Sequence, residues 1–95
     1  MIRNIVVVKV KPNTSHCQIQ DIAKALDKLK PTGRLASALH CDLGLREGNM
    51  DFAIIADFRD AATYQSYDIL PEHQRIRTEM VAPIALQVDR IQIAI

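Results

Sequence analysis

The segment from Tyr67 to His73, with the sequence YDILPEH, holds the residues of this chain best suited to chemistry. The 95 residues include only three histidines, two tyrosines and two phenylalanines, and two of these seven stand here. A histidine with an unperturbed pKa near 6.5 is a competent general base at neutral pH. A phenol beside it could polarise a carbonyl group or orient an enolate. The pair would suit proton abstraction next to a carbonyl group, without a metal or cofactor.

Pro71 decides whether the two side chains can meet. Residues six apart on an unbroken helix point about 240° apart, so Tyr67 and His73 would diverge on one helix. Because proline suits the first turn of a helix, Pro71 is predicted to start a second helical piece. The turn before it would let both rings approach one cavity. The alternative is structural: His73 braces the helix start, and Tyr67 fills the core with its hydroxyl bonded to the backbone.

The other polar residues form no recognisable catalytic or metal-binding motif. Three single carboxylates beside predicted strands are expected to be solvated: Asp42, Asp51 and Asp57. Neighbours in a strand point to opposite faces, so the adjacent His40 and Cys41 could not share one ion. His16 and Cys17 are also poorly placed together on a helix. We therefore expect no metal, although a His40 side chain turned inward could line the same cavity as His73.

Composition and charge exclude several classes of partner. The net charge is +1, and no basic stripe with stacking aromatic residues, typical of nucleic-acid-binding proteins, is present. No segment approaches the roughly 18–20 apolar residues needed to span a bilayer. The first residues lack the cleavage site of a signal peptide, and the two cysteines form no disulfide or metal motif. These features predict a cytoplasmic protein with two reduced thiols that binds neither nucleic acid nor a membrane.

The elements that would position the candidate residues follow from hydrophobic periodicity and turn signals. Strands are predicted over residues 2–11, 35–45, 51–58 and 86–95, and helices over 15–29, 60–68 and 71–81. Ser15 with Gln18 fits a capping box at the first helix, and Asp60 is a good N-cap for the second. The order βαββαβ predicts the ferredoxin-like α+β fold, a four-stranded antiparallel sheet with helices on one face.

Both faces of this sheet are predicted to be apolar. The face without helices is expected to carry Ile5, Val7, Ile55, Ile91, Ile93 and Ile95. A solvated antiparallel sheet should alternate apolar and polar residues. Leaving three or four such side chains in water would forfeit about 1.5–3 kcal/mol each. A second copy packed sheet to sheet, in a barrel-like homodimer, is therefore predicted; a ligand cavity in a monomer or a different register is the alternative.

The chain resembles the stress-responsive A/B barrel (Dabb) domain, a family of dimeric α+β barrels. The resemblance covers nearly the whole chain and rests on three segments in order. They are residues 1–12 (MIRNIVVVKVKP), residues 51–58 (DFAIIADF) followed by Asp60, and Tyr67 with residues 70–74 (LPEHQ). The last looks like the family's Tyr-x-x-His-Pro-x-His segment. The resemblance implies a single Dabb-like domain over residues 1–95, a homodimer, and a cavity between the sheet and helices of each subunit.

The resemblance also implies roles for individual residues. A plant polyketide cyclase of the same fold family uses a Tyr and a His of this segment as acid–base groups in an aldol cyclisation, and Tyr67 and His73 match them. Leu70 stands where the family pattern often has a His, and Asn4 stands where that cyclase has another. We predict Tyr67 and His73 as a catalytic pair. The residues predicted to bind a ligand are Asn4, His40 and Tyr64.

Two functions remain open from the sequence. The first is a stress-responsive A/B barrel homodimer that binds a small apolar or carbonyl-containing molecule in its cavity and needs no cofactor. The alternative is a cofactor-free lyase, cyclase or isomerase, similar to a polyketide cyclase, in which Tyr67 and His73 form an acid–base pair. A cofactor-free monooxygenase is less favoured, because the aromatic pocket residues that such enzymes tend to use are scarce.

Overall fold

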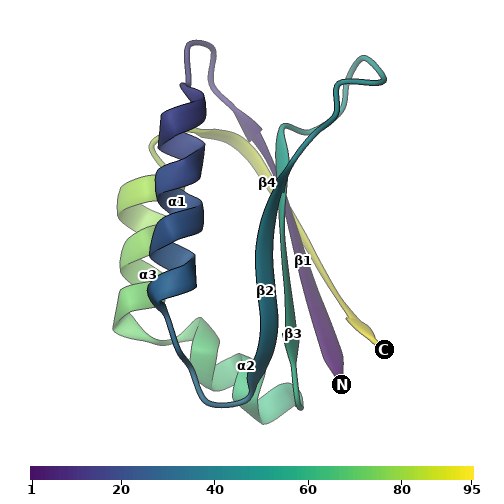
Figure 1. Ribbon diagram of the computed structural model, residues 1–95, viewed down its shortest axis with the longest axis vertical. Helices are drawn as coiled ribbons and strands as arrows, with labels where there is room; N and C mark the ends of the chain where they lie inside the picture. Colours follow the sequence, from purple (N-terminus) through teal and green to yellow (C-terminus); the bar gives the residue numbers. More distant parts are fainter.

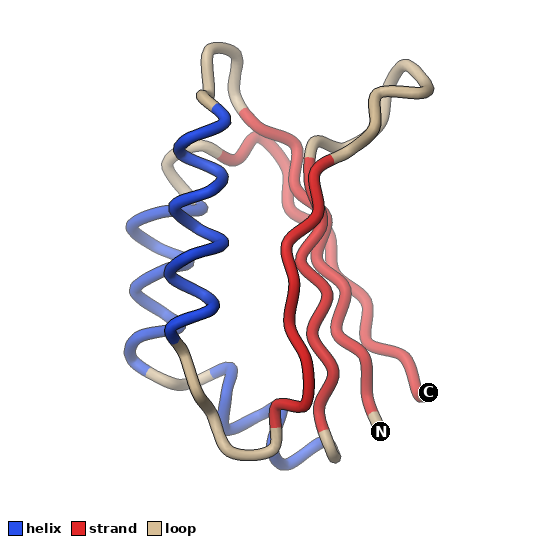
Figure 2. Tube along the Cα trace, in the orientation of Figure 1, coloured by secondary structure: helices blue, strands red, loops and turns tan.

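A computed structural model describes all 95 residues and shows one sheet covered on one side by helices (Figure 1). The elements are β1 (Ile2–Val10), α1 (His16–Lys28), β2 (Arg34–Cys41), β3 (Phe52–Phe58), α2 (Ala61–Asp68), α3 (Pro71–Ile76), the π-helical turn η1 (Arg77–Val81) and β4 (Ala85–Ala94). The four strands are antiparallel in the order β2-β3-β1-β4, and Figure 2 shows all helices on the same side of them. The predicted ferredoxin-like α+β fold is confirmed. None of the helices is long and apolar enough to span a membrane.

Side-chain caps begin the first two helices where the sequence predicts them. The backbone N–H of Gln18 donates to the Ser15 hydroxyl at 3.2 Å, and the Ser15 N–H donates to the Gln18 side chain at 2.8 Å. Asp60 and Thr63 make the same reciprocal pair at the start of α2, at 2.8 and 3.2 Å. Each capping box satisfies two backbone donors that a helix leaves unpaired. The helix starts are therefore fixed locally, before any packing.

The core lies between the sheet and the helices in two clusters. The larger contains buried residues of β1, β3, the helices and the turn before β4: Val6, Val8, Ile19, Ile22, Leu26, Phe52, Ile76 and Ile84. The smaller contains Ala56, Phe58 and Tyr67. The ring of Phe58 meets those of Tyr64 and Tyr67 at centroid distances of 5.4 and 5.0 Å. Because both tyrosines belong to α2, Phe58 fixes this helix on the sheet beside the site.

The helix predicted over residues 71–81 changes its winding part of the way along. It is α-helical to Ile76 and then opens into the π-helical turn η1. The N–H of Ala82 donates to the carbonyl of Arg77 at 2.9 Å, which is the bond five residues back that defines this winding. Arg77, Val81 and Ala82 all line the cavity described below. The sequence predicts the helix but not the wider turn at its end.

The second strand ends earlier than predicted. It stops at Cys41, so Leu43 and Leu45 lie in a loop, where they are 82% and 84% exposed. Asp42 accepts hydrogen bonds from the N–H of Gly44 at 2.8 Å and from the side chain of Asn49 at 3.1 Å. These bonds, rather than further strand pairing, stabilise the loop. The loop extends past the end of the sheet on the side away from the helices (Figure 1).

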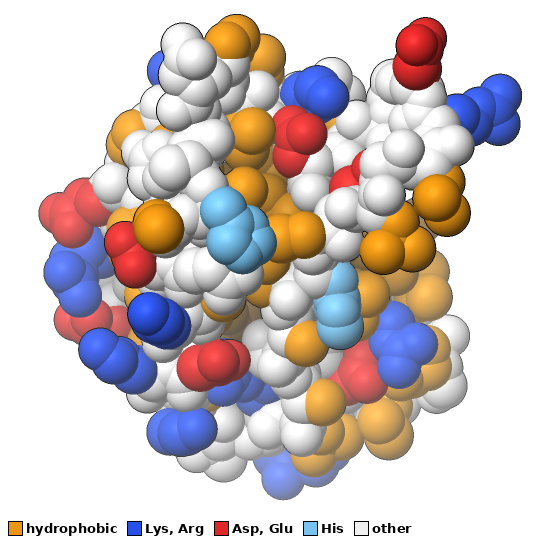
Figure 3. All heavy atoms as spheres, turned by 45° about the horizontal axis from the view of Figure 1, so that its top comes forward, with side chains coloured by type: hydrophobic (Ala, Val, Ile, Leu, Met, Phe, Trp, Pro, Cys, Tyr) orange, Lys and Arg blue, Asp and Glu red, His pale blue; other side chains and the backbone are white.

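The face of the sheet away from the helices is apolar, as predicted. In the register of the sheet, Ile5 stands opposite both Ile55 on β3 and Ile91 on β4, so three β-branched side chains are neighbours. Figure 3 shows hydrophobic side chains gathered along this side of the molecule. Arg3 and Asp57 flank them in a bidentate ion pair at 2.8 and 3.0 Å. We call this surface the open face.

Candidate functional site

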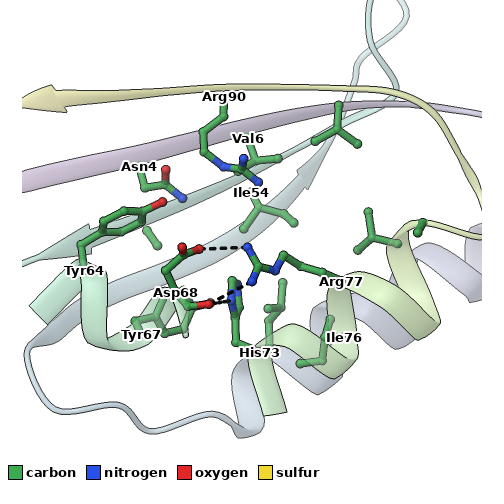
Figure 4. A pocket seen from close by; sticks show the side chains of 15 residues that line it. Asn4, Val6, Ile54, Tyr64, Tyr67, Asp68, His73, Ile76, Arg77 and Arg90 are labelled. Carbon is green, nitrogen blue, oxygen red and sulfur yellow. Dashed lines mark hydrogen bonds and ion pairs between the residues drawn. The ribbon is translucent and has the colours of Figure 1, made fainter. Parts of the chain in front are cut away.

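A cavity of about 170 Å³ lies between the sheet and the helices α2, α3 and η1 (Figure 4). Its lining is mostly apolar and includes Val6, Ile54, Ala56, Ile76, Val81 and Val88. An engineered apolar cavity of about 150 Å³ in another protein binds benzene. The cavity therefore admits an apolar body about the size of one six-membered ring.

Tyr67 and His73 meet at one wall of this cavity. Their ring centroids are 4.2 Å apart, at an interplanar angle of 42°. The α2 helix ends at Asp68 and α3 begins at Pro71, so the chain turns between the two residues. The break at Pro71 thus removes the divergence that one continuous helix would impose. Both side chains line the cavity.

The Tyr67 phenol is held in its neutral form. The residue is only 3% exposed, and burial raises its pKa, which the charge of Arg34 partly offsets. The Arg34 guanidinium carbon lies 5.8 Å from the centroid of the Tyr67 ring. Arg34 also donates to the carbonyls of Leu26 and Leu29, at 3.2 and 2.6 Å, so it joins the end of α1 to this ring. A neutral phenol at neutral pH can donate a hydrogen bond.

His73 is held as a neutral imidazole with a defined tautomer. Its Nδ1 lies 3.4 Å from the backbone carbonyl oxygen of Asp68. A carbonyl oxygen only accepts hydrogen bonds, so this contact places the proton on Nδ1 and leaves the lone pair on Nε2. Burial lowers the pKa of His73, the Asp68 carbonyl opposes this effect, and the charge of Arg77 adds to it. Nε2 is therefore free to accept a proton at neutral pH.

Arg77 links the end of α2 to η1 through hydrogen bonds to Asp68. One guanidinium nitrogen donates to the Asp68 carboxylate at 2.9 Å, and the other donates to the Asp68 backbone carbonyl at 3.0 Å. The same carbonyl is the one that His73 contacts, as the dashed lines in Figure 4 show. The charge of Arg77 is thus balanced by Asp68, and His73 is positioned by the same group.

A polar bridge crosses the other side of the cavity. The side-chain N–H group of Gln92 donates to the Asn4 amide oxygen at 2.7 Å and reaches the Tyr64 hydroxyl at 3.4 Å. Asn4 is buried, and its own NH₂ group makes no hydrogen bond within the chain. Burial raises the pKa of Tyr64, and the charge of Asp68 adds to this, so Tyr64 is also neutral. Asn4 and Tyr64 both line the cavity.

His40 lies away from the other predicted site residues. In the β2–β3 register it stands opposite Ala53, while its neighbour Leu39 stands opposite Ile54 and packs on the core. Adjacent strand residues point to opposite faces, so His40 faces away from the helices. It lines a separate hollow beside Val7 and Leu43. The interpretation that His40 shares a cavity with His73 is wrong.

The remaining polar candidates have structural partners. Asp51 accepts a hydrogen bond from the N–H of Val10 at 2.7 Å, and Asp57 is paired with Arg3. These two carboxylates are therefore engaged rather than solvated, contrary to expectation. No group of three or more His, Cys, Asp or Glu side chains is arranged to hold a metal ion, and both cysteines are exposed free thiols.

Four residues of the site were missed in the sequence: Asp68, Arg77, Arg90 and Gln92. Asp68 and Arg77 are nine positions apart across the proline break, which is no helical spacing, so nothing in the sequence links them. Arg90 and Gln92 did carry a signal. They alternate with Val88 on the predicted helix-facing side of the last strand, where polar residues interrupt an apolar pattern.

Folding stability should fall as the pH drops from about 7.5 to about 5, with His73 responsible. Its pKa is lowered from 6.5 in the folded protein, so the unfolded chain binds this proton more readily. The contribution of neutral His73 is complete above about pH 6.5 and is lost as the pH falls through the folded-state pKa. Urea unfolding midpoints at the two pH values should show a smaller decline for His73→Gln than for the wild type.

His16→Gln is the control for this measurement, because His16 is exposed on α1. It should keep the wild-type pH dependence. The pKa of Asp57 is lowered by its hydrogen bond from Arg3, and its contribution is lost only below about pH 3.8, outside the measured range. An unchanged pH dependence in His73→Gln would contradict the assignment.

Comparison with protein families gives a match over nearly the whole chain. The family model of the stress responsive A/B barrel domain, Dabb, matches residues 2–93. No curated protein matches the chain significantly.

Solved structures share the fold over almost their full lengths. A dimeric ferredoxin-like protein of unknown function from Thermobifida fusca is 28% identical, with a TM-score of 0.87 over 99% of this chain and 90% of that one. A Dabb family protein from Mesorhizobium loti is 21% identical, with a TM-score of 0.80 over 99% and 95%. The hydroxynitrile lyase from Passiflora edulis is also 21% identical, with a TM-score of 0.82 over 99% and 92%.

Proposed function

Because the chain belongs to the stress responsive A/B barrel (Dabb) family, we propose that it is a homodimer that binds a small apolar or carbonyl-containing molecule between its sheet and helices. The observation that carries the proposal is the cavity, where an apolar lining meets a few convergent polar groups (Figure 4). This combination is typical of small-molecule sites, in which apolar walls supply affinity and polar groups fix orientation.

The polar groups suit a carbonyl oxygen. The unpaired NH₂ of Asn4 and the neutral phenol of Tyr64 are hydrogen-bond donors that line the cavity. An apolar ring would fill the space beside Val6 and Ile54, while an oxygen on that ring accepts from one of these donors. The cavity volume of about 170 Å³ limits the body of the ligand to about one ring with short substituents.

The homodimer is supported by the open face. Ile91 and Ile93 of this face are exposed in the single chain, while Ile5 and Ile55 are half-buried. Leu43 and Leu45 extend in a loop on the same side. A second copy would remove both features from water. The Thermobifida fusca protein, 28% identical, is described as dimeric.

Ligand binding is tested by filling the cavity from its edge. Val88 is on the edge strand β4 and lines the cavity, so Val88→Phe should occupy the space with little risk to folding. Titration of ¹⁵N-labelled protein with cyclohexanone, a neutral single-ring ketone, should show saturable shifts for the wild type. The dissociation constant should rise at least about tenfold in Val88→Phe, since ring-sized apolar burial contributes more than about 1.4 kcal/mol.

Leu86→Phe is the matched control for this titration. Leu86 is an exposed residue of the same strand that does not line the cavity. It should bind cyclohexanone as the wild type does. Equal binding by Val88→Phe and Leu86→Phe would place the ligand elsewhere and refute the proposal.

A second candidate function is proton transfer by Tyr67 and His73, as in a cofactor-free lyase, cyclase or isomerase. The observation that favours it is the 4.2 Å approach of the two rings beside the cavity. Nε2 of His73 would remove a proton next to the carbonyl group of a bound ligand. The Tyr67 phenol would donate to the oxygen as negative charge develops there. A hydroxynitrile lyase shares this fold, so the fold can host a lyase.

A further inference from the structure

Arg90 is a cation without a partner at the edge of the cavity. It projects from β4 toward the interior, and in Figure 4 its guanidinium lies beside Val6 and Ile54. It lines the cavity but takes part in no ion pair and no side-chain hydrogen bond. The neighbouring Asp89 is on the opposite face of the strand, where it accepts a hydrogen bond from Gln87 at 2.6 Å.

The other ionisable groups of the cavity leave this charge unbalanced. Asp68 is the only carboxylate in the lining, and Arg77 already pairs with it at 2.9 Å. His73 is neutral, because burial and both arginines, Arg77 and Arg90, lower its pKa. The two tyrosines are neutral phenols. The cavity therefore carries one net positive charge, against an otherwise apolar wall.

We propose that the physiological ligand is an anion, with an apolar body of about one ring and a carboxylate that Arg90 binds. The proposal rests on the proposed ligand-binding function and specifies its ligand class. The planar guanidinium matches a carboxylate with two parallel hydrogen bonds, which a neutral amide of the same shape cannot reciprocate. The unpaired NH₂ of Asn4 offers a further donor to the same group.

A matched pair of probes isolates the charge. Cyclohexanecarboxylate and cyclohexanecarboxamide have the same ring and nearly the same shape, so their affinities differ through the carboxylate alone. Titrations of ¹⁵N-labelled protein at about pH 7.5 and fixed ionic strength should show the carboxylate binding about five- to twentyfold more tightly, as expected for a partly exposed charged hydrogen-bonded pair. The signals that move should include those of Val88 and Ile54.

Three variants make the test specific to Arg90. Arg90→Gln should bind both probes with similar affinity. Arg90→Lys should keep part of the preference for the carboxylate, since lysine retains the charge but lacks the paired donors of the planar guanidinium. Arg75→Gln should keep the whole preference, because Arg75 pairs with Glu72 and Glu79 on the outer side of the helix. Arg90 is exposed, so its replacement leaves the core intact.

The outcomes separate this inference from the proposed function. Equal binding of the two probes by the wild type, or a preference that survives in Arg90→Gln, would overturn the anionic ligand while cavity binding stands. A preference whose shifted signals lie outside the cavity would also overturn it. If neither cyclohexanone nor either of the two probes binds, the ligand-binding function itself fails.

Discussion

Exchange of the protons next to the carbonyl of cyclohexanone for deuterium should slow by about 10²–10⁴-fold when His73 is replaced by glutamine. The neutral imidazole presents Nε2 as the base, because its Nδ1 proton is directed at the Asp68 carbonyl. Glutamine keeps a polar side chain of similar reach but has no basic nitrogen. Proton NMR in deuterated buffer gives the exchange rate directly and requires no knowledge of the physiological substrate.

The controls distinguish proton transfer from a general loss of structure. Tyr67→Phe keeps the ring contacts with Phe58 and His73 and removes only the hydroxyl, so it should slow exchange less than His73→Gln does. His16→Gln should exchange at the wild-type rate. Wild-type exchange no faster than that caused by an equal concentration of free imidazole would exclude the acid–base function and leave ligand binding untouched.

The pH profile of exchange follows from the same histidine. Protonation of Nε2 abolishes the base, so the rate should fall on the acidic side. Since burial lowers the pKa of His73 from 6.5, the fall should begin at a lower pH than for an exposed histidine. Arg90→Gln should move this fall to higher pH, because the charge of Arg90 contributes to lowering the pKa of His73.

Local sequence signals were sufficient for most of the fold. Ser15 and Gln18 have the spacing of a capping box, and Asp60 is a residue type favoured at the N-cap, so both predict helix starts without tertiary information. Pro71 likewise predicts the break that lets Tyr67 and His73 meet, since its effect on the backbone is local. The order of elements then leaves few topologies for the sheet.

The side of the sheet that a residue faces could not be predicted as well. The β2–β3 register shifts between Arg34, opposite Phe58, and Ala36, opposite Asp57. The bulge inverts the alternation, so Arg34 reaches Tyr67 while Ala36 and His40 face the other way. Strand pairing decides which face of the sheet each residue lies on, and the sequence of one strand does not reveal that pairing.

The early end of β2 has the same origin in non-local contacts. Apolar residues at alternate positions from Leu39 to Leu45 predict a continued strand, but Asp42 closes a loop with Asn49, seven positions away. The π-helical turn and the pair of Asp68 with Arg77 depend on how two helical pieces meet across Pro71. These features complete the cavity and follow from packing rather than from periodicity.

Ile91→Asp should convert the proposed homodimer into monomers. Ile91 is 57% exposed in the single chain and stands opposite Ile5, which is at the centre of the open face. In a two-fold symmetric interface the substitution occurs twice, and each buried unpaired carboxylate costs several kcal/mol. The dimer dissociation constant should therefore rise by about 10³-fold or more. Light scattering coupled to size-exclusion chromatography at micromolar concentration measures the change.

The exposure of Ile91 makes this prediction discriminating, because a monomeric protein would tolerate the same aspartate. Ile69→Asp is the matched control: Ile69 is 67% exposed between α2 and α3, on the helical side of the molecule, and its substitution should leave the dimer intact. A wild type that elutes as a monomer, or an Ile91→Asp variant that stays dimeric, would mean that the apolar open face has another role. Dissociation with unchanged cyclohexanone binding would further show that each subunit holds a complete cavity, since the open face and the cavity lie on opposite sides of one sheet.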